Sequence, residues 1–268
     1  MRRSRIAAYV TSLLLAVGLA LTGAAAAQAS PLAAAGGYVA LGDSYASGVG
    51  AGSYISSSGS CDRSTNAAPY LWQAAHAPAS FSFLACSGAK TTDVLSNQLG
   101  TLSSATSLVS ITIGGNDAGF SDVMTTCVLQ SDSSCLSRIA TAKAYVDSTL
   151  PGQLDAVYSA ISSRAPSAHV VVLGYPRFYK LGTTCVGLSD TKRSAINGAA
   201  DYIDAAIAKR AADHGFTFGD VRTTFSGHEI CSSDSWLHSV DWLNIGQSYH
   251  PTAAGQSGGY LPVLTNAA

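Results

Sequence analysis

Charged side chains are scarce in this 268-residue chain. Asp, Glu, Lys and Arg make up 12% of the sequence, with 15 basic and 16 acidic residues. No run of basic residues is present, so nothing indicates binding to nucleic acid or to an anionic membrane surface. The six cysteines lack a Cys-x-x-Cys pair, which leaves a zinc site or a thioredoxin-like motif little support. We expect no metal, no cofactor and no nucleic-acid partner.

Long apolar runs are also missing, except at the start of the chain. Residues 2–5 include three arginines, residues 6–21 are apolar, and residues 27–29 (Ala-Gln-Ala) fit a small-residue cleavage site. The run of 16 residues is shorter than the ~20 that a membrane-spanning helix needs. We therefore predict a signal peptide over residues 1–29, a secreted, extracellular protein without a membrane anchor, and a single domain over residues 30–268.

The cysteine count is even, which in an exported chain favours three disulfides. Six cysteines allow fifteen connectivities. Consecutive pairing is favoured because each bridge then closes a local loop. The predicted pairs are Cys61 with Cys86, Cys127 with Cys135, and Cys185 with Cys231.

Apolar runs without alternation recur along the chain, and each ends at small or polar residues. This pattern is typical of strands buried on both faces of a parallel sheet. The runs span residues 38–41, 81–85, 108–113 and 169–173, with a weaker one at 216–221. Helices are predicted between them at 67–77, 136–150, 153–164 and 191–214, and a last one starting near Thr252. The alternation of strands and helices predicts an α/β fold with crossover connections.

Three chemically useful residues follow three of these strands. Ser44 comes after the first, Gly88 after the second and Asn116 after the third. Ligands of open α/β sheets bind beyond the carboxyl ends of the strands. Acyl transfer requires a nucleophile and hydrogen-bond donors for a developing oxyanion. The Ser44 hydroxyl can be the nucleophile, and the unobstructed Gly88 amide and the Asn116 carboxamide can be the donors. The backbone amide of Ser44 is the third candidate donor.

A serine nucleophile needs a base, and His250 is the strongest candidate among six histidines. It lies in a loop, is followed by proline and precedes the last predicted helix. His169, at the head of a strand, His76, late in a helix, and His214, at a helix end, fit ordinary structural roles. A literal Gly-x-Ser-x-Gly occurs at residues 255–259, but no strand precedes it, as a nucleophile elbow would need.

Four short motifs together resemble the SGNH (GDSL) hydrolase family. They are Gly42-Asp43-Ser44-Tyr45 with Gly48, then Gly88, then Gly114-Gly115-Asn116-Asp117, then His250-Pro251. The export signal and the cysteines are similar to those of secreted actinobacterial lipases and esterases of this family. The resemblance implies a three-layer α/β/α sandwich around a five-stranded parallel sheet of flavodoxin-like type. It also implies Ser44 as nucleophile, His250 as base, and an oxyanion hole made by Ser44, Gly88 and Asn116, without metal or cofactor.

The sequence departs from the family pattern at Gln247, where many members carry an acidic residue three positions before the histidine. Two arrangements could orient the base instead. A backbone carbonyl of Gln247 or Ser248 accepts the His250 Nδ1 proton and fixes the tautomer, or Asp241 reaches the ring. We favour the carbonyl, because a fixed tautomer is the main requirement of the base.

The function predicted on this basis is hydrolysis of fatty-acyl esters through an acyl-serine intermediate, by a monomer. Two alternatives within the family are a phospholipase and a polysaccharide acetyl esterase. A third is a secreted binding module that has lost catalysis, and the intact Ser44, Gly88, Asn116 and His250 argue against it.

Overall fold

Five parallel strands form one sheet in the computed structural model, which describes residues 36–268. The predicted signal peptide lies outside the described residues. The strands are β1 (Gly37–Gly42), β2 (Ser80–Phe83), β3 (Thr106–Thr112), β4 (His169–Leu173) and β5 (Thr217–Gly219). Their order is β2-β1-β3-β4-β5, and every neighbouring pair is parallel. This is the flavodoxin-like order, so the predicted fold class is confirmed.

The strands β1 and β3, which lie inside the sheet, are almost completely buried. All six residues of β1 are buried, and so are six of the seven in β3. The edge strand β2 alternates Ser and Phe, and none of its residues is fully buried. Strands covered on both faces have no solvent-facing side, so they favour apolar residues and small polar ones such as Ser110 of β3, which bonds to Tyr38.

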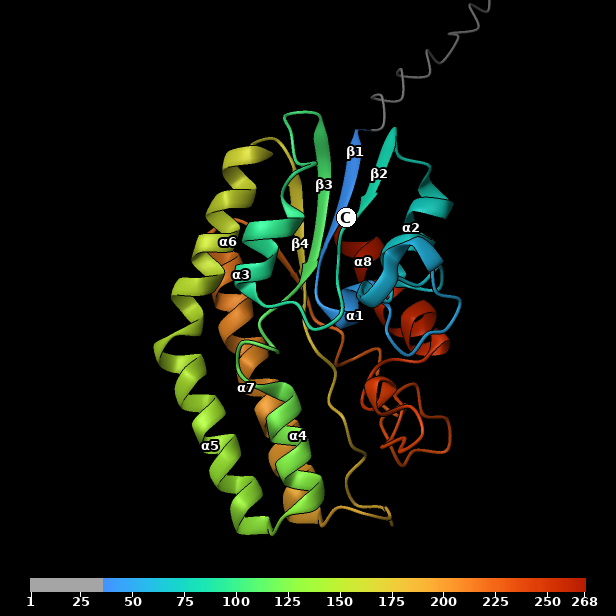
Figure 1. Cartoon of the computed structure of the whole chain (residues 1–268), viewed down its shortest axis with the longest axis vertical. Helices are drawn as coiled ribbons and strands as arrows, with labels where there is room; N and C mark the ends of the chain where they lie inside the picture. The colour runs from blue at the N-terminus through green and yellow to red at the C-terminus, as the bar shows by residue number, and fades with distance from the viewer. Residues whose placement is uncertain (1–35) are drawn as a thin grey trace, which may run out of the picture. The chain divides into compact units, whose positions relative to one another are not determined.

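Helices cover both faces of the sheet (Figure 1). On one face lie α3 (Thr91–Asp93), α6 (Leu150–Arg164) and α7 (Asp190–Asp213), and on the other α2 (Ala68–His76) and α8 (Leu261–Ala267). The remaining helices are α1 (Ser44–Ser47), α4 (Phe120–Leu129) and α5 (Asp132–Ser148). Short 3₁₀ or π segments, η1 to η4, span Ser56–Cys61, Val94–Gln98, Ile245–Gln247 and Gly255–Tyr260.

Helix α4 is an element that the sequence did not predict. Its ten residues include Val123, Thr125, Thr126 and Val128, which are β-branched and poor helix formers. It packs closely against α5, to which the Cys127–Cys135 disulfide joins it. Tertiary packing therefore overrides local propensity here.

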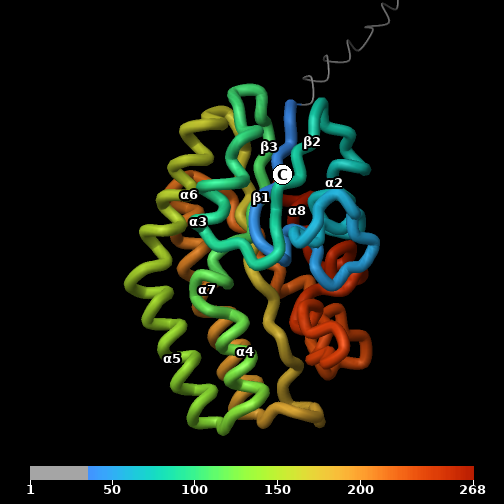
Figure 2. Tube along the Cα trace, viewed as in Figure 1, coloured from blue at the N-terminus to red at the C-terminus, as the bar shows by residue number. Residues whose placement is uncertain are grey.

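The lower parts of α5 and α7, together with α4, extend beyond the carboxyl ends of the strands (Figure 1, Figure 2). Helix α1 lies at the same edge of the sheet, directly after β1. The cysteines pair consecutively, as the spacing predicted: Cys61–Cys86, Cys127–Cys135 and Cys185–Cys231. Within residues 36–268 no helix is long and apolar enough to cross a membrane.

Candidate active site

Ser44 is the first residue of α1, at the carboxyl end of the central strand β1. The Asp43 side chain caps this helix by accepting a hydrogen bond from the Tyr45 amide at 2.9 Å. The helix ends after one turn at Gly48, which adopts the left-handed conformation (φ 87°) that favours glycine. This tight turn leaves Ser44 7% exposed, facing the space beyond the sheet.

His250 contacts Ser44 across 206 positions of sequence, with 2.7 Å between Nε2 and Oγ. Its other ring nitrogen, Nδ1, lies 3.1 Å from the Ser248 carbonyl oxygen. A carbonyl only accepts, so Nδ1 carries the proton and the neutral ring offers Nε2 as acceptor to the Ser44 hydroxyl. This is the tautomer that a general base needs.

The Ser248 carbonyl, one of the two predicted, is therefore the group beside His250 Nδ1. The Gln247 carbonyl accepts instead from the His250 backbone amide at 3.1 Å. The Asp241 carboxylate is bonded within its own loop, to the amides of Leu243 and Asn244. Its position gives no support to the alternative in which Asp241 reaches the imidazole.

The loop that carries His250 is held from two sides. The Tyr45 hydroxyl donates to the Tyr249 carbonyl at 2.6 Å, and Tyr249 has a positive φ of 66°. His238 pairs with the loop through two backbone bonds, to Tyr249 and His250. A non-glycine residue in this conformation is held by its surroundings, so the loop is fixed where the base is needed.

The two other predicted donors lie on adjoining loops. The Asn116 Nδ2 group donates to the Ala89 carbonyl at 3.0 Å, which ties the loop after β3 to the loop after β2. Nδ2 carries two protons, so the second stays available for a ligand. Gly88 has φ 75°, a conformation that favours glycine, and a Cβ at this position would meet nothing within 4 Å. Asp117 braces the same junction by accepting from the Thr91 hydroxyl at 2.6 Å.

A mostly apolar pocket begins at Ser44 and Asn116 and runs between α4, α5 and α7. Phe120 and Phe178 line it near the site, and α7 contributes Ile196, Ala199 and Ile203 at successive turns. The far wall includes Ala142 and Val146 of α5, beside the partly buried Lys143. Such a pocket accepts a hydrocarbon chain and offers few polar groups to a sugar.

Burial lowers the pKa of His250 to about 4, because a charged imidazolium is poorly solvated in this site. The base is neutral, and hence active, above that pKa. We expect the acid limb of kcat/KM, which reports the free enzyme, near pH 4 and not near the ordinary 6.5. A pH–rate profile for a p-nitrophenyl ester measures it.

The Asp43 carboxyl group can also titrate within the pH–rate profile. Burial also raises the pKa of Asp43, to about 7, although hydrogen bonds from Tyr175 and Tyr45 oppose the shift. An acid limb near 7 that disappears in Asp43→Asn would belong to Asp43. A limb near 6.5 that persists in Asp43→Asn would contradict the expectation for His250.

The three other histidines weighed as bases, and the serine of the literal Gly-x-Ser-x-Gly, make no contact with Ser44. His214 contacts Asp155, His76 contacts the Trp72 carbonyl, and His169 contacts the Ala267 carbonyl. Ser257 is exposed on η4, and its hydroxyl contacts only the Ala254 carbonyl. Among residues 36–268 no group of three or more potential metal ligands is found.

One neighbour of the site lies outside the motifs identified in the sequence. Tyr175 follows β4 and Gly174, and its hydroxyl donates to Asp43 Oδ2 at 2.5 Å. The available signal was its position, because it stands at a fourth strand end of the same sheet as Ser44, Gly88 and Asn116.

The chain matches the model of the GDSL-like lipase/acylhydrolase family over residues 40–257. It belongs to this family. The match confirms the family that the motifs indicated, and with it a serine ester hydrolase. Among curated relatives, the chain is 76% identical to Lipase 1 of Streptomyces coelicolor and 66% identical to a lipase of Streptomyces rimosus, each over the full length of both chains.

Two solved structures are similar to most of this chain. Phospholipase A1 from Streptomyces albidoflavus NA297 is 69% identical, with a TM-score of 0.86 over 88% of this chain and all of that one. An extracellular lipase from Streptomyces rimosus is 68% identical, with a TM-score of 0.85 over 87% of this chain and all of that one.

Proposed function

We propose that this chain is an extracellular, monomeric lipase that cleaves fatty-acyl esters through an acyl-Ser44 intermediate. The observation that carries the proposal is the Ser44–His250 contact at one end of an apolar pocket. The lipase names of the two curated relatives and the extracellular lipase among the solved structures support the substrate class and the location.

The proposed reaction has two halves. His250 Nε2 takes the Ser44 proton as Oγ attacks the ester carbonyl, while the Ser248 carbonyl holds the ring through Nδ1. The amides of Ser44 and Gly88 and the Asn116 carboxamide stabilise the oxyanion. The imidazolium then protonates the leaving alcohol. In the second half, His250 activates a water molecule that hydrolyses the acyl-enzyme and restores Ser44.

The pocket favours a fatty-acyl group over acetate. An acetyl group would leave the apolar walls of α4, α5 and α7 without contact, whereas a longer chain buries surface worth about 0.8 kcal/mol per methylene. A phospholipid is a second candidate substrate, because its fatty-acyl chains would fit the same pocket. The 69% identical phospholipase A1 supports this candidate.

We expect p-nitrophenyl decanoate to be cleaved with higher kcat/KM than p-nitrophenyl acetate. Ala199→Leu should narrow the pocket and lower kcat/KM for decanoate more than tenfold, since losing two methylene contacts costs roughly 1.6 kcal/mol. Hydrolysis of acetate should be unchanged. Ala205→Leu is the matched control, because Ala205 is exposed on the same helix and does not line the pocket.

A sharp preference for acetate together with no effect of Ala199→Leu would contradict the lipase proposal.

Labelling by a fluorophosphonate, located by mass spectrometry, tests the nucleophile independently. An adduct should form at Ser44 and be lost in Ser44→Ala; an adduct at Ser257 would contradict the assignment. Release of fatty acid from phosphatidylcholine, compared with a triacylglycerol, separates the two substrate candidates.

A further inference from the structure

A single hydroxyl, that of Tyr175, joins the two loops on which the proposed chemistry depends. It donates to Asp43 Oδ2 at 2.5 Å and accepts from the Gly115 amide at 3.0 Å. Asp43 immediately precedes Ser44, and Gly115 immediately precedes Asn116. The hydroxyl therefore bridges the carboxyl ends of β1 and β3 at the point where both loops turn towards the pocket.

The Asp43 carboxylate transmits this contact to both sides of the nucleophile. Its Oδ1 accepts from the Tyr45 amide at 2.9 Å, one residue after Ser44, while Oδ2 accepts from Tyr175. The Asp43 backbone amide is bonded to the Thr112 carbonyl at the end of β3. The turn that presents the Ser44 amide is thus fixed through the same carboxylate that Tyr175 holds.

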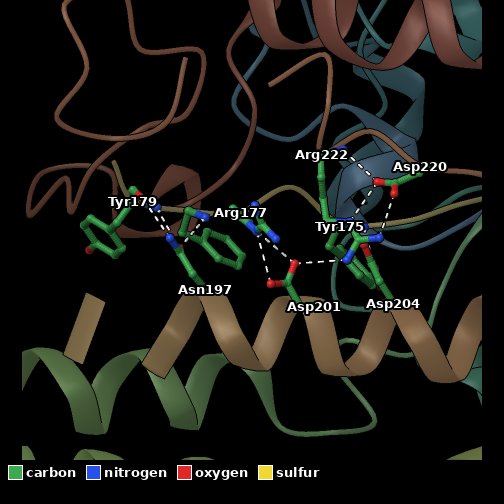
Figure 3. Close-up of polar contacts among 9 residues, drawn as sticks. Tyr175, Arg177, Tyr179, Asn197, Asp201, Asp204, Asp220 and Arg222 are labelled. Atoms are coloured by element: carbon green, nitrogen blue, oxygen red, sulfur yellow. Dashed lines mark hydrogen bonds and ion pairs between the residues drawn. The ribbon is translucent and has the colours of Figure 1, made fainter. Parts of the chain in front are cut away.

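Tyr175 is itself fixed from behind by α7 (Figure 3). Its backbone amide donates to Asp204 Oδ1 at 2.9 Å, and Asp204 is fully buried. The Tyr175 ring is 5% exposed and stands edge-on to the Tyr45 ring at 5.1 Å. Farther along the same segment, Asn197 of α7 accepts from the amides of Phe178 and Tyr179. The helix therefore holds the whole segment from 175 to 179.

We propose that Tyr175 is a positioning residue for ester hydrolysis, whose hydroxyl sets the spacing between the Ser44 amide and the Asn116 carboxamide. This inference rests on the proposed function. It adds a residue to the proposed function. Tyr175 contacts neither oxyanion donor directly, so its effect passes through Asp43 and Gly115. Oxyanion donors act only when they are held in place before the charge develops.

The expected size of the effect follows from geometry. Misplacing catalytic groups by about 1 Å can cost about 100-fold in rate. Tyr175→Phe keeps the buried ring and the pocket wall but removes the bridge, leaving the Gly115 amide without its acceptor. We expect kcat to fall by about 10- to 100-fold, with KM for p-nitrophenyl decanoate changed less than twofold.

The control is Tyr38→Phe. The Tyr38 hydroxyl is also buried, bonds to Ser110 Oγ at 2.6 Å, and likewise links β1 to β3, but within the strands and away from Ser44. Tyr38→Phe loses one buried hydrogen bond and Tyr175→Phe loses two, and each lost bond costs about 1 kcal/mol or more of stability. Measured at 25 °C, well below each melting temperature, only Tyr175→Phe should lose kcat.

Further results would separate a positioning role from a structural one. A double variant of Tyr175→Phe with Asn116→Ala should lose less than the product of the two single effects, because both disturb one oxyanion site. A fall in melting temperature with kcat intact, as in Tyr38→Phe, would overturn the proposal, and so would a change confined to KM. Failure of the proposed function would give a different result: the Ser44→Ala variant would hydrolyse the ester as fast as the wild type does.

Discussion

Replacing Ser44 with alanine should lower kcat by about 10⁶-fold, and His250→Ala should lower it by a similar factor. The reason is the 2.7 Å contact between His250 Nε2 and Ser44 Oγ, in which each group depends on the other. Without the base the hydroxyl is a weak nucleophile, and without the hydroxyl the base has no proton to take. Steady-state kinetics with p-nitrophenyl decanoate measure both effects.

The double variant tests whether the two residues act as a unit. Ser44→Ala with His250→Ala should be no slower than either single variant, since residues of one catalytic unit are strongly non-additive. Asp241→Asn is the control and should keep most of the activity, because the Asp241 carboxylate is bonded within its own loop. A loss near 10⁴-fold in Asp241→Asn, the scale of removing a triad acid, would restore Asp241 as the orienting group.

Replacing Asn116 with alanine should have the next largest effect, a fall in kcat of about 10²- to 10³-fold. The carboxamide proton not bonded to Ala89 is free to meet an oxygen that becomes negative. Because this bond strengthens as the charge develops, KM should change little. Kinetics and a melting curve of the same sample separate a catalytic effect from a loss of folding.

A matched control removes a carboxamide that has only a structural role. The Asn66 Nδ2 group donates to the Ala51 carbonyl at 2.8 Å, as Asn116 does to Ala89. Asn66→Ala should cost a similar amount of stability and leave kcat within about threefold. If both variants lose activity in parallel with stability, Asn116 contributes through loop structure and not through the oxyanion.

The positions of the strands along the chain and the residues at their ends could be predicted, because both depend on short sequence segments. The arrangement of the strands in the sheet was implied by the family resemblance. An unbroken apolar run such as residues 38–41 is too short for a buried helix and suits a buried strand, and Gly42-Asp43-Ser44 ends it with polar groups in the expected place. Helix α4 could not be predicted, because its stability comes from α5 and a disulfide and not from its own residues.

Within the site, the choice of Ser44 and His250 needed only residue type and position. The orienting carbonyl of Ser248 could be narrowed to two residues but not assigned, since any residue has a carbonyl and only the loop conformation selects one. The position of Tyr175 at a strand end could be read from the sequence, but its contacts could not. Its hydroxyl bonds to Asp43 and Gly115, 132 and 60 positions away, and no local pattern encodes such contacts.

The separation of 206 residues between Ser44 and His250 has a consequence for the timing of activity during biosynthesis. The strand that presents the nucleophile leaves the ribosome early, but the loop bearing the base emerges only after the other four strands of the sheet. We therefore expect a nascent or truncated chain that lacks this loop to hydrolyse no ester. On this expectation, the cell that makes the protein meets no ester hydrolysis by it until synthesis is almost finished.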